Sequence, residues 1–142
     1  MELPLPEQNA LEEGYQSLLG LCDRLEAIAD SLPRRIDTAS CRVVAERLSS
    51  TLLTVHRLED EILFPAITAA RCRDDGQRLI ERLRDEHRHD GKAAEQVARV
   101  LNELLHGRSP HSWEAIGYML RAFFETVRRH VATERLLLAE RI

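Results

Sequence analysis

The apolar residues of this chain recur at alternating steps of three and four along four long segments. That spacing lines them up on one stripe of an α-helix, as in helices that bury one face in a bundle. The expected helices span residues 7–32, 38–71, 76–106 and 110–141. Because the connections between them are short, neighbouring helices should run antiparallel. The sequence therefore predicts an all-α fold, an up-down-up-down antiparallel four-helix bundle.

The connections carry residues that end and begin helices. The stretch "SLPRRIDT" follows the first segment, and "CRDDG" separates the second from the third. The stretch "HGRSPHS" separates the third from the fourth, where Ser109 and Pro110 are the expected cap and first turn. The apolar stripes run from Leu11 to Leu32, from Cys41 to Ala69, from Ile80 to Leu104 and from Trp113 to Leu137.

Length and composition narrow the class of protein. A chain of 142 residues has the size of one domain, so residues 1–142 are expected to form a single unit. Hydrophobic residues make up 44% and charged residues 31%, a balance that excludes a disordered chain. The net charge is -4 and acids lie among the arginines, which gives no reason to expect nucleic acid as a partner.

The sequence also bears on where the protein works. No apolar run approaches the ~20 residues of a membrane span, and the opening "MELPLPEQ" lacks the regions of a secretion signal. The three cysteines fit no zinc spacing and are expected to be reduced thiols. We therefore expect a cytoplasmic protein without a membrane partner, and a homo-oligomer is compatible with these features.

Polar residues interrupt the apolar stripes at six positions. They are Tyr15, Glu59, His87, Asp90, His130 and Glu134. Tyr15 lies early in the first segment and His87 early in the third. Glu59 lies late in the second segment and His130 late in the fourth. In an up-down-up-down bundle these places share one end, so the polar side chains are expected to form one layer across the core.

Two histidines and two carboxylates that converge inside a bundle have the composition of a metal site. Imidazole and carboxylate together suit iron, manganese or zinc, and bundles build such sites from inward-facing side chains. His130 and Glu134 are four residues apart and therefore project from one helix face. A metal would neutralise Glu59 and Glu134, which are costly when buried and unpaired. A metal-free network of His–Glu hydrogen bonds would also satisfy these groups.

The remaining polar candidates are given other roles. Asp90 lies one turn beyond His87 and is expected to be a partner of a ligand rather than a ligand. His89, His106 and His111 fall off the stripes and are expected on the surface. No nucleophile–base pair and no phosphate-binding loop is visible, so the sequence gives little support for an enzyme with an organic substrate.

Three stretches in order, "EDEILFPAI", "RDEHRHD" and "RRHVATE", resemble the hemerythrin-like domain, also called the HHE cation-binding domain. The resemblance covers nearly the whole chain. It implies a four-helix bundle that holds a non-haem di-iron centre and binds or senses a small ligand such as dioxygen or nitric oxide. It further implies that Glu59 and Glu134 bridge two irons, and that His87 and His130 are ligands.

The resemblance fails at two positions, both in one half of the di-iron site. Tyr15 stands where the first-helix histidine is expected, and Val55 where the second-helix histidine is expected. Tyr15 would then ligate as a phenolate, donate a hydrogen bond to a metal-bound oxygen, or fill space. His56 either replaces the lost ligand through a local helix adjustment or flanks the stripe and pairs with Asp60 or Glu59. The apolar register favours the flanking arrangement.

Two functions remain from the sequence. The first is an iron-binding protein with an altered, mononuclear or dinuclear, site that binds or senses a small ligand. The second is a metal-free bundle that keeps the fold for protein–protein interaction. Metal content separates the two.

Overall fold

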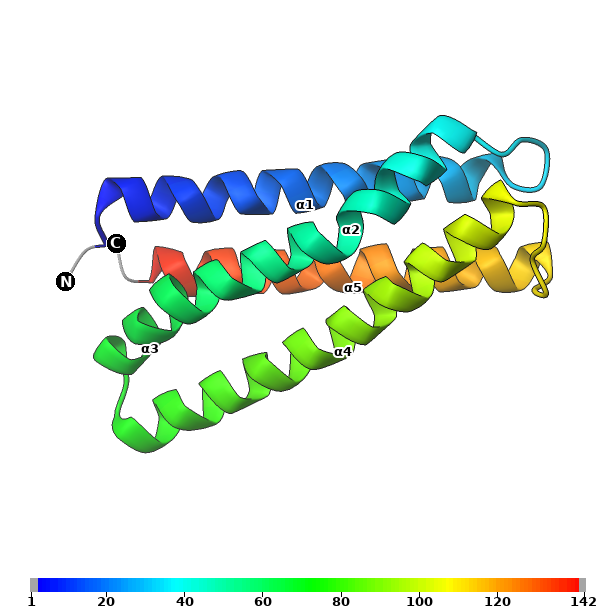
Figure 1. The fold of residues 1–142 in the computed structure, drawn as a ribbon. Helices are drawn as coiled ribbons and strands as arrows, with labels where there is room; N and C mark the ends of the chain where they lie inside the picture. Colours follow the sequence, from blue (N-terminus) through cyan, green and yellow to red (C-terminus); the bar gives the residue numbers. More distant parts are fainter. Residues whose placement is uncertain (1–2, 141–142) are drawn as a thin grey trace.

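The structure is a computed structural model that describes residues 3–140, and it is built from helices (Figure 1). Its elements are α1 (Leu5–Ser31), α2 (Thr38–Leu58), the π-helical turn η1 (Glu59–Leu63), α3 (Phe64–Ala70), α4 (Arg73–Leu105) and α5 (Trp113–Ala139). Residues 3–140 contain no strand, so the predicted all-α class is confirmed. None of the helices in this range combines the length and apolar character needed to span a membrane. The expected end of the last helix, at residue 141, lies outside the described residues.

The long helices form a bundle in which each has two long neighbours. Helix α1 packs against α2 and α5, and α4 packs against α2 and α5. In Figure 1 the α1–α2 and α4–α5 connections lie at one end of the molecule, and the α3–α4 connection lies at the other. Residues from all four long helices therefore meet along one interior.

The buried apolar residues form two clusters. The main core runs along the bundle and includes Leu18, Leu48, Leu101 and Leu120. The end core is smaller and consists of Leu63, Phe64, Ile67, Leu83 and Leu137. Three of the predicted polar positions fall between main-core and end-core residues along the chain: Glu59 between Val55 and Leu63, His87 between Leu83 and Ala94, and Glu134 between Val131 and Leu137.

The second predicted helix contains a turn of a different kind. The N–H of Phe64 donates to the carbonyl of Glu59, five residues back, which makes this turn π-helical. The cause lies in Pro65, which has no N–H to continue an α-helical ladder. Its ring would also press on the carbonyl of Glu61, four residues earlier. The wider turn shifts the apolar register, so Ile67 is buried and Ala69, predicted in the stripe, is exposed.

Two predicted helix starts are wrong by three residues. Helix α5 begins at Trp113 rather than at 110, because the Ser112 side chain accepts the N–H of Ala115 and caps the helix there. Ser109 and Pro110 lie in the connection, and Trp113 is half-exposed rather than part of the core. The stretch "CRDDG" is mostly helical, because α4 already begins at Arg73 and its first turn favours the acids that follow.

The cap at Ser112 gives a test of the corrected helix start. Replacing Ser112 with Ala leaves the N–H of Ala115 without its partner, so the free energy of unfolding should fall by about 1 kcal/mol. Ser109→Ala is the matched control, because Ser109 was the cap expected from the sequence and lies outside α5. Chemical denaturation of both variants measures the difference. A larger loss for Ser109→Ala would contradict this start of α5.

Candidate metal centre

Glu59 is the most deeply buried acid of the predicted layer. It is the first residue of the π turn and is 0% exposed. Its Oε2 accepts a hydrogen bond of 2.9 Å from the hydroxyl of Tyr15 on α1. Its Oε1 lies 3.2 Å from Nε2 of His87 on α4. The carboxylate of Glu59, in the π turn, therefore contacts side chains of both α1 and α4.

The contact between Glu59 and His87 is incomplete. Glu59 Oε1 and His87 Nε2 are both buried, and neither has a hydrogen-bond partner among the described residues. A buried polar atom without a partner costs roughly 1–3 kcal/mol, so two such atoms facing each other call for a further group. A carboxylate oxygen and an imidazole nitrogen are both ordinary ligands of transition metals. The residues present therefore fit a cation.

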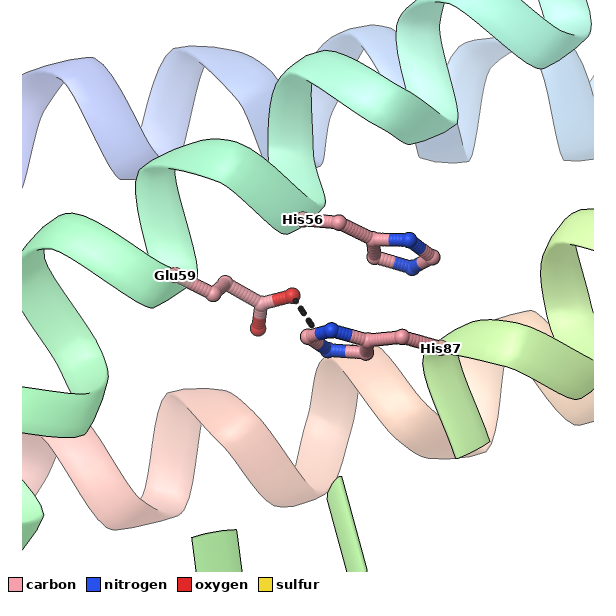
Figure 2. Close-up of side chains that lie close together, drawn as sticks. All are labelled: His56, Glu59 and His87. Carbon is pink, nitrogen blue, oxygen red and sulfur yellow. Dashed lines mark ion pairs between the residues drawn. The ribbon is translucent and has the colours of Figure 1, made fainter. Parts of the chain in front are cut away.

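His56 completes this group, as Figure 2 shows. Its ring stacks on that of His87 with centroids 3.8 Å apart and an angle of 7° between the planes. One ligand atom each from His56, Glu59 and His87 lies within 4.8 Å of the others. We call these three residues the metal cluster. Burial and the neighbouring His87 lower the pKa of His56 to about 4, which leaves its imidazole neutral near pH 7 and able to ligate.

One of the two arrangements considered for His56 needs a local helix adjustment, and a π turn lies close to this residue. The π turn begins three residues beyond it, at Glu59. No hydrogen bond or ion pair within residues 3–140 joins His56 to Asp60. Val55 is buried and packs toward α1, where an added Cβ on Gly14 would lie 3.2 Å from its side chain. Ligation by His56 stays a prediction.

Tyr15 acts as a hydrogen-bond donor inside the core. It is 0% exposed and donates directly to a carboxylate of the cluster. Burial, and then the negative charges of Glu59 and Glu134, raise the pKa of Tyr15. The phenol therefore keeps its proton and holds one oxygen of Glu59 in place.

Glu134 borders the cluster from α5. It is buried, and its Oε1 lies 3.8 Å from His87 Nε2. Burial raises the pKa of Glu134 to about 11, and hydrogen bonding with Glu59 adds to the rise. Burial also acts to raise the pKa of Glu59, but its contacts with Glu134 and His87 lower it overall. The opposite directions of the two pKa shifts mean that, without a cation, Glu134 holds a proton more firmly than Glu59 does.

His130 belongs to a neighbouring group rather than to the metal cluster. Its Nδ1 lies 2.5 Å from Oδ2 of Asp90, and its Nε2 lies 3.7 Å from Oε2 of Glu86. The hydrogen bond to Asp90 raises the pKa of His130. Asp90, expected from the sequence to be a partner of a ligand, pairs with His130. Glu86 was missed, although its position four residues before Asp90 places both on one face of α4.

The layer predicted from the sequence is thus divided. Tyr15, Glu59, His87 and Glu134 come together, and His56 joins them. His130 lies outside this contact set, and its role as a ligand stays a prediction. The expectation that His89, His106 and His111 lie on the surface is confirmed.

Comparison with known families gives one match. The model of the hemerythrin HHE cation binding domain matches residues 10–142. This range is most of the chain and includes every residue of the site. Searches of curated proteins and of solved structures gave no match.

The bond from Tyr15 to Glu59 can be tested in metal-free protein. Replacing Tyr15 with Phe leaves Glu59 Oε2 buried without its donor, so the free energy of unfolding should fall by about 1–3 kcal/mol. Tyr118→Phe is the matched control, because Tyr118 is 77% exposed. Denaturant titration in the presence of a chelator measures both. Equal stability of the two variants would show that the phenol does not support the carboxylate.

Proposed function

The chain belongs to the hemerythrin HHE cation-binding domain family, and we propose that it binds a transition-metal cation at His56, Glu59 and His87. The observation that carries the proposal is the pair of buried atoms, Glu59 Oε1 and His87 Nε2, that face each other without hydrogen bonds. The antiparallel order of the four long helices, expected from the sequence, is part of this proposal. It brings ligands from several helices into one layer.

Iron is the metal we propose, with manganese and zinc as alternatives, since imidazole and carboxylate ligands suit all three. Glu59 and His87 would hold the cation together with His56, and Glu134 lies close enough to join them. Tyr15 holds Glu59 through its hydroxyl, which fixes the direction of the carboxylate. A bound iron would supply redox chemistry and an open coordination position for a small ligand.

The proposed centre is altered relative to a di-iron site. Tyr15 and Val55 supply no imidazole, and Val55 faces Gly14 on α1. His130 is held by Asp90, with Glu86 on its other nitrogen. These observations support one strongly held metal, with the His130 group beside it. The proposed role is the binding or sensing of a small molecule such as dioxygen or nitric oxide.

The proposed ligands can be tested by metal titration. His87→Ala and His56→Ala should each weaken binding of Fe(II) or Zn(II) by about tenfold or more, a loss of at least about 1.4 kcal/mol. His111→Ala, at an exposed histidine outside the cluster, should leave the affinity unchanged. Calorimetric titration with elemental analysis of each variant measures the affinity and the number of metals per chain. Wild-type protein that stays colourless and refuses Fe(II), Mn(II) and Zn(II) would contradict the proposal and favour the metal-free bundle.

Replacing Glu59 gives a second test that distinguishes a metal-binding protein from a metal-free bundle. If it ligates, Glu59→Leu should abolish metal binding and the part of thermal stability that metal adds. If it is a bare buried acid, leucine should stabilise the protein, because packing replaces a desolvated charge. Melting curves with metal and with a chelator distinguish these results. A Glu59→Leu protein with unchanged metal content would remove Glu59 from the site.

A further inference from the structure

The metal cluster is closed on most sides. Tyr15 and Glu59 are 0% exposed, and Glu134 is 4% exposed. The side chain of His87 keeps 11% of its exposure, and His56 is half-buried. The histidine pair is therefore the side of the cluster that lies nearest to solvent.

A groove between α2 and α4 ends at this pair. It has a volume of about 350 Å³, and its lining includes His56, His87, Leu52 and Gly91. Since one water takes up about 30 Å³, the groove has room for a cation with water around it. Figure 2 shows the two imidazoles reaching toward each other from the two helices that form its walls.

Gly91 leaves the space beside His87 empty. It follows His87 by one helical turn on α4, and side chains on a helix lean back over the preceding turn. A Cβ added at Gly91 would meet no atom within 4 Å. A larger side chain at this position would therefore start in open space and narrow the groove that Gly91 lines with His87.

The charges at the rim do not bar a cation. Arg88 is paired with Asp85 on the same helix. Lys92 and Glu95 also line the groove and carry opposite charges. The rim is therefore close to neutral, so access depends on space more than on electrostatic attraction or repulsion.

We propose that the α2–α4 groove is the route by which a divalent transition-metal cation enters and leaves the cluster, and that Gly91 keeps this route open. The inference rests on the proposed metal binding and adds a residue that acts on rates rather than on affinity. A route narrowed at Gly91 slows entry and exit alike, because the bound state itself is unchanged.

The test uses Co(II) as the probe, because its visible absorption reports ligation. Gly91→Leu should slow both Co(II) uptake and its removal by a chelator by about tenfold, with the dissociation constant unchanged. Gly117→Leu is the matched control: Gly117 lies inside α5, an added Cβ there also meets nothing within 4 Å, and it does not line the groove. Both changes replace glycine by a better helix former, so folding should not suffer.

A second variant approaches the route from the opposite wall. Leu53 lines the groove from α2 and is 58% exposed, so Leu53→Ala should speed both rates. Leu136→Ala is its control, at a residue of α5 that is 68% exposed.

The outcomes are distinct. Gly91→Leu rates equal to those of Gly117→Leu would overturn the route while leaving metal binding intact. A larger dissociation constant for Co(II) in Gly91→Leu would place Gly91 in the site rather than on the route. That result would also overturn the proposed route. Wild-type protein that binds no Co(II) would overturn the proposed function and the route together.

Discussion

A fully buried carboxylate, that of Glu59, sets the conditions for the rest of the site. It lies between two apolar cores, where an ionised acid without partners is unfavourable by several kcal/mol. Tyr15 compensates one oxygen with a hydrogen bond. The other oxygen faces His87, and the two atoms satisfy neither each other nor any described neighbour. The surrounding side chains therefore compensate the buried charge of Glu59 only in part.

Much of the layer followed from residue spacing. The three-and-four stripes place Tyr15, Glu59, His87 and Glu134 on buried helix faces, and short connections bring their ends together. The π turn was missed because the α-helical period was continued beyond Glu59, whereas a turn widened by one residue moves the later buried residues to other positions. Pro65 was the available signal, since it removes a donor from the helix interior. Without that turn, the apolar register gave Ala69 a buried place.

Side-chain partners explain the other difference. Helix spacing selects the face on which His130 lies, but the direction of its ring depends on the strongest nearby acceptor. That acceptor is Asp90 on α4, whose Oδ2 lies 2.5 Å from Nδ1 of His130. The imidazole therefore turns to Asp90 rather than to Glu59. The start of α5 also depends on a side-chain partner, because the hydroxyl of Ser112 accepts the backbone N–H of Ala115. Such choices depend on contacts between elements and are not visible in a single segment.

The bond from Tyr15 also bears on how many metals the site can hold. A carboxylate that bridges two metals uses one oxygen for each. In Glu59 the phenol of Tyr15 donates to Oε2, which leaves that oxygen one lone pair, and Oε1 is directed at His87. A protonated phenol that donates to the carboxylate competes with a metal for the same oxygen. Under the proposed function, Tyr15 therefore favours Glu59 as the ligand of a single cation beside His56 and His87.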